Sequence, residues 1–96
     1  MTTLANPSHP GEVLDELFLS PLDLSAGALA KKLGVPRTRI ERLVKGDTAL
    51  TADTALRLSR FFGNTAEFWM NLQRAHDLDQ ARKTVDVSFI QPMRAA

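Results

Sequence analysis

The segment Ser25–Gly46, SAGALAKKLGVPRTRIERLVKG, decides the fold, because its pattern predicts two short helices joined by a tight turn. Ser25 can cap the first helix, since its side-chain oxygen can accept a hydrogen bond from an open backbone N–H group. Gly34 can adopt a positive φ without steric cost and so can end that helix. Pro36 has its φ preset for the first turn of the second helix, and Gly46 can close it.

Apolar side chains recur at helical spacing on one face of each predicted helix. They are Leu29, Ala30 and Leu33 in the first helix, and Ile40, Leu43 and Val44 in the second. The small side chain of Ala30 suits a steep crossing of the two helices. This is the helix-turn-helix pattern, whose second helix enters the major groove of DNA. The same residues would also suit an ordinary helical hairpin with a basic, solvated face.

Charge is distributed unevenly along the chain, although its 12 basic and 11 acidic side chains nearly cancel. Residues 1–30 contain four acidic side chains and no Lys or Arg, whereas residues 31–45 contain six basic side chains and one acidic one. Residues 46–96 contain six of each sign. A basic stripe confined to a candidate recognition helix indicates where a phosphate backbone would lie.

Composition limits the class of protein. A chain of 96 residues, 44% of them apolar, is enough for one small domain with one core. The absence of Cys excludes a disulfide, a thiolate nucleophile and a cysteine-based zinc site. The chain starts without the pattern of a signal peptide and lacks the ~20-residue apolar run of a membrane span. We therefore expect a cytoplasmic protein.

Three further helices are predicted around the central pair. The first should begin near Pro10, with His9 or Ser8 as the candidate cap, and end at Pro21, which cannot continue a helix. Its expected buried face consists of Val13, Leu14, Leu17 and Phe18. The fourth helix should follow the cap Thr51 and end at Gly63, and the fifth should follow the cap Thr65 and run to about Lys83.

The end of the chain has a different periodicity. Val85, Val87 and Phe89 alternate with a period of two, which predicts an extended tail, either disordered or paired with a partner strand. We expect a flexible arm over residues 1–8, the domain over residues 9–83 and the tail over residues 84–96. Phe68 and Leu72 should close the core of the domain. The large apolar groups then left without a place should form a homodimer interface: Trp69, Val85, Val87 and Phe89.

The predicted recognition helix offers candidates for base contacts opposite its apolar face: Arg37, Thr38, Arg39 and Arg42. Arg37 and Arg39 are the candidates for bidentate contacts to guanine O6 and N7, and Thr38 for a thymine methyl group or a phosphate. Because one short helix contacts few base pairs, we expect a dimer on a palindromic site in double-stranded DNA.

Phosphate contacts are expected from Lys31, Lys45 and the helix start at Thr51, because helix N-termini present free N–H groups. Glu41 could accept a hydrogen bond from a cytosine amino group, or it could pair with Lys45 four residues on. The histidines, His9 and His76, show no ligand spacing. No paired carboxylates, nucleophile–base set or phosphate loop is evident, so we expect no enzyme, no metal and no cofactor.

Four segments carry a resemblance to a known family: HPGEVLDELFLSPLDLS at 9–25, ALAKKLGVPRTRIERLVKG at 28–46, LTADTALRLSRFFGNTAEFWMNLQ at 50–73 and ARKTVDVS at 81–88. Together they resemble the HigA antitoxin family, also called the VapI or plasmid-maintenance antidote group. The resemblance implies an all-α domain of five helices, of the phage-repressor type. One departure is Ala26-Gly27, where many relatives carry a long polar side chain; Gly27 weakens its helix by about 0.5–1 kcal/mol relative to Ala.

The resemblance also implies a function. Members of this family are dimeric DNA-binding antitoxins that neutralise an RNA-cleaving toxin of the RelE-like (HigB) type and repress their own operon. Asp15, Glu16 and Asp23, in the acidic N-terminal part, are the candidates for contact with a basic toxin. The alternatives are a stand-alone transcription regulator and an interaction module that binds no DNA. A small basic reading frame immediately upstream would favour the antitoxin.

Overall fold

Helices make up most of the protein in a computed structural model that describes residues 8–94. They are α1 (Pro10–Val13), the π-helix η1 (Leu14–Leu19), α2 (Ser20–Leu22), α3 (Ala26–Leu33), α4 (Arg37–Val44), α5 (Ala52–Phe62) and α6 (Ala66–Thr84). The first three run on without a break and form one rod, so the fold has five helical rods. Residues 8–94 contain no strand. The predicted all-α fold of five helices is therefore confirmed.

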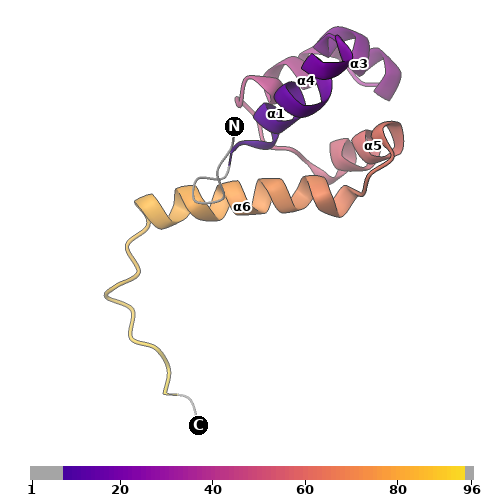
Figure 1. Ribbon diagram of the computed structural model, residues 1–96. Helices are drawn as coiled ribbons and strands as arrows, with labels where there is room; N and C mark the ends of the chain where they lie inside the picture. Colours follow the sequence, from indigo (N-terminus) through magenta and orange to yellow (C-terminus); the bar gives the residue numbers. More distant parts are fainter. Residues whose placement is uncertain (1–7, 95–96) are drawn as a thin grey trace.

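The helices form a small layered domain from which α6 projects. Figure 1 shows α1, α3, α4 and α5 gathered on one side of the first half of α6, while the second half of α6 and the tail extend away. The principal extents are 52 × 25 × 21 Å. Most of the core comes from these buried side chains: Leu14, Leu19, Leu29, Ala30, Leu33, Ile40, Leu43, Leu50, Ala55, Leu58 and Trp69. The apolar faces predicted for α3 and α4 lie in this core, except that Val44 is half-buried.

Side-chain caps start the helices as predicted. The side chains of Ser25, Thr51 and Thr65 accept hydrogen bonds from backbone N–H groups in the first turns of α3, α5 and α6. The Nδ1 atom of His9 accepts from the N–H of Gly11, 2.9 Å away, and starts α1. Since each cap satisfies an N–H group that the helix leaves open, these short helices can begin where the chain emerges from a loop.

The first rod contains a π turn that the sequence pattern did not reveal. The prediction that Pro21 ends the helix is wrong, because the helix continues to Leu22 and ends at Asp23, whose φ is 52°. Leu17, predicted to be buried, is 63% exposed, whereas Leu14 and Leu19 are buried. The spacing of five between Leu14 and Leu19 matches the wider π turn, which moves Leu17 off the apolar face.

The first rod crosses α4 at Gly11. A Cβ atom built on Gly11 would lie 1.7 Å from the carbonyl oxygen of Leu43 and 3.0 Å from the Cα atom of Val44. Both neighbours are backbone atoms of α4, so they cannot turn aside as a side chain could. Only glycine therefore allows α1 to lie this close to α4, and the crossing fixes the orientation of α4 on its buried side.

The aromatic residues at the start of α6 exchange the places predicted for them. Trp69, assigned to a dimer interface, is fully buried within the chain, and Phe68, assigned to the core, is 37% exposed. The Trp69 ring contacts Phe18 at a centroid distance of 4.9 Å, and its Nε1 donates to Asn64 Oδ1 at 2.9 Å. The assignment of Trp69 to the dimer interface is therefore wrong, because the core has room for the larger ring and a partner for its N–H group.

A buried side chain joins α6 to the loop that precedes α5. The Oε1 atom of Gln73 accepts a hydrogen bond from the N–H of Leu50 at 2.7 Å, and both residues are buried. The Nε2 atom of Gln73 donates to Asp77 at 2.8 Å. The loop between α4 and α5 is thus anchored on α6.

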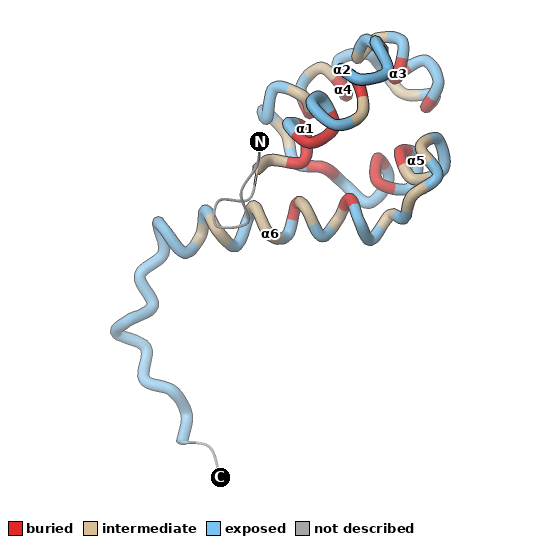
Figure 2. The backbone as a smooth tube through the Cα atoms, in the orientation of Figure 1, coloured by how far each residue is buried: buried red, intermediate tan, exposed pale blue. Residues whose placement is uncertain are grey.

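Beyond α6 the tail makes no regular structure. It follows Thr84, close to the predicted end of the helix, and all residues from 85 to 94 are exposed (Figure 2). Residues 85–94 form no strand within this chain, and a turn there closes with a hydrogen bond from the N–H of Ile90 to the carbonyl of Val87. Pairing with a strand of a partner stays a prediction. Of the predicted arm, residues 1–7 lie outside the described residues. No helix in the described part of the chain is long and apolar enough to cross a membrane.

Candidate nucleic-acid interface

The exposed face of α4 carries the four residues predicted for base contacts. Arg37, Thr38, Arg39 and Arg42 are all exposed, while Ile40 and Leu43 on the other face are buried. The buried pair fixes the rotation of the helix, so the exposed side chains are presented together. The predicted phosphate-binding residues Lys31, in the last turn of α3, and Lys45, at the C-cap of α4, are also exposed.

A hollow of about 440 Å³ lies between α4 and the start of α5. It is lined by Thr38, Arg39 and Arg42 from α4, by Thr48, Ala49 and Thr51 from the connecting loop, by Asp53 and Thr54 from α5, and by Pro36 and Leu43. The Oγ1 atom of Thr51 accepts from the N–H of Thr54 at 3.4 Å, so the remaining N–H groups of the first turn of α5 stay free. The hollow thus combines cations and a helix N-terminus, both of which favour phosphate, with the carboxylate of Asp53, which does not.

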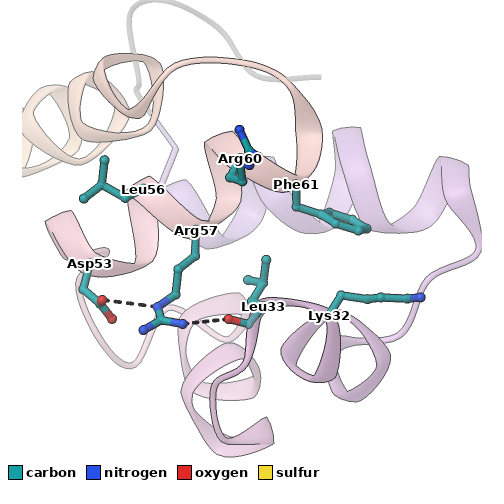
Figure 3. Close-up of a pocket in the computed structure, with 7 residues that line it drawn as sticks. All are labelled: Lys32, Leu33, Asp53, Leu56, Arg57, Arg60 and Phe61. Atoms are coloured by element: carbon teal, nitrogen blue, oxygen red, sulfur yellow. Dashed lines mark hydrogen bonds and ion pairs between the residues drawn. The ribbon is translucent and has the colours of Figure 1, made fainter.

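Arg39 is tied to a neighbouring helix by an acidic residue that sequence analysis did not single out. Its Nη1 atom donates to Asp53 Oδ2, and the Nε atom of Arg57 donates to Asp53 Oδ1 at 3.2 Å. Arg57 also donates from Nη1 to the carbonyl oxygen of Leu33 at 2.8 Å, the contact that Figure 3 shows at the end of α3. The hydrogen bonds from Arg39 and then from Arg57 lower the pKa of Asp53 below its usual value.

The Asp53–Arg57 half of this cluster had a signal in the sequence, since the two residues lie four apart on one predicted helix. The Arg39–Asp53 half had none, because 14 residues and a loop separate the two side chains. Arg57 extends this cluster to the end of α3. The structure places it in a second hollow, of about 540 Å³, lined by Lys32, Leu33, Asp53, Leu56, Arg57, Arg60 and Phe61 (Figure 3).

Arg37 makes two contacts at the start of α4. Its Nε atom lies 3.3 Å from Glu41 Oε2, one turn along the same helix. The predicted pair of Glu41 with Lys45 is therefore wrong, because Glu41 pairs toward the start of the helix instead. The aliphatic part of the Arg37 side chain passes Gly27, where an added Cβ would lie 2.9 Å from Arg37 Cδ. A larger residue at position 27 would displace a flexible side chain rather than backbone.

The two histidines, which lie far apart in the sequence, are neighbours in the fold. Their ring centroids are 5.2 Å apart, with the rings nearly perpendicular. Burial, followed by the proximity of His76, lowers the pKa of His9, against the opposing effects of a hydrogen bond with the Thr48 backbone and of Asp77 and Glu12. Among residues 8–94 no group of three or more His, Cys, Asp or Glu side chains could hold a metal ion.

The residues predicted for protein partners belong to elements other than α4. Asp15, Glu16 and Asp23 are exposed on the first rod, and a hollow of about 270 Å³ lies beside them, with Asp15 and Asp23 in its lining. Leu17 and Leu22 are exposed on the same rod and add apolar surface. The sequence pattern had assigned Leu17 to the buried face and had given Leu22 no place. In the tail, the remaining dimer candidates are exposed: Val85, Val87 and Phe89.

Comparison with known proteins agrees with this geometry. A family model described as helix-turn-helix matches residues 16–69. Virulence-associated protein I of Dichelobacter nodosus is 52% identical over 75 residues, 78% of this chain and 69% of that protein. Antitoxin HigA-1 of Vibrio cholerae is 38% identical over 93 residues, 95% of this chain and 88% of that protein. The chain belongs to the HigA antitoxin family.

The HigA fold itself is matched among solved structures. The antitoxin HigA of Pseudomonas aeruginosa, solved with the higBA promoter, superposes with a TM-score of 0.84 at 36% identity over 93% of this chain and 100% of that one. The resemblance drawn from the four sequence segments is confirmed. The HigA family comprises helix-turn-helix antitoxins and is not a class of enzymes.

Proposed function

We propose that this HigA family member binds the promoter of its own operon through α4, represses it as a dimer, and neutralises an RNA-cleaving toxin of the RelE-like, HigB type. The observation that carries the DNA-binding part is the exposed row of Arg37, Thr38, Arg39 and Arg42 beside the free N-terminus of α5. The relative solved with a promoter, which shares the fold over nearly the whole chain, supports the same assignment.

In the proposed complex α4 enters the major groove. Arg37 and Arg39 make the bidentate contacts to guanine, and Thr38 contacts a thymine methyl group or a phosphate. Lys31, Lys45 and the free N–H groups after Thr51 contact phosphates, and so fix the position of α4 without selecting a sequence. Both kinds of contact are needed, because phosphate contacts alone would bind all DNA equally.

A matched pair of substitutions tests this division. Arg39→Ala should cost about 1–3 kcal/mol on the specific site and relax base preference there. Lys45→Ala should weaken binding to all sequences alike and reduce the slope of log K against log salt by about one. Fluorescence anisotropy with the promoter fragment and a scrambled duplex measures both. An unchanged ratio of specific to scrambled affinity in Arg39→Ala would show that Arg39 makes no base contact.

Dimerisation in the proposal rests on the tail. Val85, Val87 and Phe89 are exposed on a segment that extends away from the core (Figure 1), and Ile90 and Met93 on the same segment are exposed as well. A two-fold interface buries the same surface of both chains. It would also hold two α4 helices about 34 Å apart, which is one turn of DNA. Trp69, buried in the core, takes no part in this interface.

The toxin-binding surface in the proposal is the first rod. Asp15, Glu16 and Asp23 supply negative charge that complements a basic ribonuclease, and the exposed Leu17 and Leu22 supply apolar contact area. Opposite charges accelerate encounter more than they increase affinity. Reversal of Asp15 and Glu16 to Lys should therefore slow association with the product of the adjacent upstream gene at low salt, whereas Glu67→Lys, on α6, should not. Equal stopped-flow rates would contradict this assignment. If that gene product does not bind at all, the chain is a stand-alone regulator.

A further inference from the structure

Arg39 differs from the other exposed side chains of α4 in being tied to another helix. Its Nη1 atom donates to Asp53 Oδ2 on α5, while the second oxygen of Asp53 accepts from Arg57 Nε at 3.2 Å. Arg57 in turn donates to the carbonyl of Leu33 at 2.8 Å. The three side chains thus link the end of α3, the first turns of α5 and the exposed face of α4.

We propose that Asp53 is a positioning residue that determines the specificity of DNA binding by holding Arg39 in the geometry for base contact. The inference rests on the proposed function, in which Arg39 contacts guanine. The guanidinium group is a rigid, planar fork with five N–H donors. Asp53 accepts a hydrogen bond from Nη1 of Arg39. The Nε and Nη2 atoms of Arg39 therefore remain as donors for the two acceptors on the major-groove edge of guanine.

The physical advantage of a held arginine is twofold. An arginine that is already ordered loses less side-chain freedom when it binds than a mobile one does. A mobile arginine can also swing to a phosphate, which strengthens binding to every sequence and adds nothing to selectivity. An arginine that is held in place faces only the base edge. Opposite a base that lacks two acceptors, the N–H groups of the arginine stay unpaired, and that base is disfavoured.

Asp53 is itself held, which a single surface ion pair would not achieve. Exposed pairs are weak and change partners easily. Here Arg57 restrains the carboxylate from the far side, and Arg57 is fixed by a backbone carbonyl at the end of α3. Its Nη1 atom also lies 3.5 Å from the position that a Cβ on Gly34 would occupy, so Arg57 packs against the turn between α3 and α4. The support for Arg39 therefore extends to the turn that sets the angle between the two helices.

The test compares two variants that each remove one negative charge near the expected DNA surface. Asp53→Asn removes the acceptor charge that holds Arg39, and Asp47→Asn removes a charge in the loop after α4. The probe is a 20-bp duplex of the consensus that the wild-type protein selects from a random library, with a scrambled duplex of the same composition. Thermal unfolding of each variant shows that the fold is retained.

Both variants should bind the scrambled duplex slightly more tightly, because each removes repulsion from phosphate. Only Asp53→Asn should lower the ratio of specific to scrambled affinity, by about three- to tenfold. Arg57→Lys keeps the charge but cannot bridge Asp53 and Leu33, so it should also lower the ratio of specific to scrambled affinity, by a smaller factor. An unchanged ratio in Asp53→Asn would overturn the proposal. So would a raised ratio, because Asp53 would then be a latch that competes with DNA.

A base analogue provides a second measurement that a purely structural role would not change. Replacement by 7-deazaguanine, at the guanine whose selection Arg39→Ala abolishes, should weaken wild-type binding by about tenfold. In Asp53→Asn the same replacement should cost clearly less, and an equal cost would overturn the proposal. If Arg39→Ala leaves the selected consensus unchanged, the proposed base contact of Arg39 fails. If Arg39→Ala changes the consensus and Asp53→Asn leaves the ratio of specific to scrambled affinity unchanged, only the positioning role fails.

Discussion

The helical core, residues 10–76, buries the apolar side chains of its inner faces, whereas the distal segment, residues 77–94, has no buried residue. In the helical core the side chain of Trp69 is fully buried, whereas in the distal segment Phe89 is 74% exposed. No residue that the structure describes beyond Gln73 is buried. The comparison teaches that the two regions depend on different forces: packing within the chain maintains the core, and the distal segment has apolar surface to offer to another molecule.

The distal part of α6 stays helical by local interactions. Asp79 and Lys83 form an ion pair at 3.1 Å with i,i+4 spacing, and Arg82 and Lys83 lie in the last turn, where cations suit the helix dipole. Such contacts are worth a few tenths of a kcal/mol each. They keep the helix straight as a support for the tail but add little to the stability of the core.

The largest expected effect comes from truncating one aromatic residue in each region. Trp69→Ala should destabilise the fold by about 3–5 kcal/mol, because it leaves a cavity and an unpaired Asn64. Phe89→Ala, at an exposed position, should change the unfolding free energy by less than about 0.5 kcal/mol. Chemical denaturation at low protein concentration measures both. Equal effects would show that the tail belongs to the folded core.

A second substitution tests the crossing of α1 and α4 within the helical core. Gly11→Ala should cost roughly 3 kcal/mol, because its Cβ would meet the backbone of Leu43 at 1.7 Å. Gly63→Ala is the control: its φ is +76°, but a Cβ there meets nothing within 4 Å, so we expect the cost of the left-handed conformation alone, about 1 kcal/mol. Melting temperatures that fall equally would contradict the close approach.

Removal of the tail tests the other side of the comparison. Deleting residues 85–96 should leave the melting temperature of the core nearly unchanged but weaken dimerisation by about tenfold or more, as expected when an apolar interface is lost. Operator binding should weaken in parallel, because a palindromic site requires two linked α4 helices. Light scattering at micromolar concentration gives the oligomeric state. A truncated dimer as tight as the full-length one would place the interface elsewhere.

The smallest expected effect is a dependence on pH at His9, the residue that caps the first helix of the helical core. Because the pKa of His9 is lowered in the folded protein, chiefly by burial, the unfolded chain binds the proton more readily. The contribution of His9 is therefore complete above about pH 6.5 and is lost as the pH falls below it. His9→Asn keeps a capping acceptor and should flatten this fall, whereas His9→Ala should also cost about 1 kcal/mol at neutral pH. Unfolding curves between about pH 5.5 and 7.5 check both, with His76 still present in each variant.

The sequence predicted the elements whose signals are local. Caps at Ser25, Thr51 and Thr65 act within one turn of their own position, and Gly34 and Gly63 end their helices with positive φ as expected. Helical periodicity likewise identified the buried faces of α3 and α4. These signals depend on neighbours three or four residues away, so a single sequence contains them.

What the sequence did not predict depends on contacts between distant segments. The π turn moves Leu17 to the surface, and no local rule distinguishes it from an α turn in the sequence. The choice of Trp69 over Phe68 for the core depends on Phe18 and Asn64, which meet the ring only in the folded chain. The contact of Arg39 with Asp53 and the backbone approach at Gly11 are also tertiary. The residues that position the candidate interface were therefore harder to predict than those that form its exposed face.

The hydrogen bond between Gln73 and the N–H of Leu50 makes one amide proton an indicator of how firmly α6 is docked. Leu50 lies in the loop between α4 and α5, outside any helix, where amide protons ordinarily exchange with solvent within moments. Its partner is a buried side chain on α6, so exchange requires α6 to separate from the loop. The exchange rate of this single proton would therefore report whether dimerisation through the tail, or binding of α4 to DNA, stabilises the contact between α6 and the loop before α5.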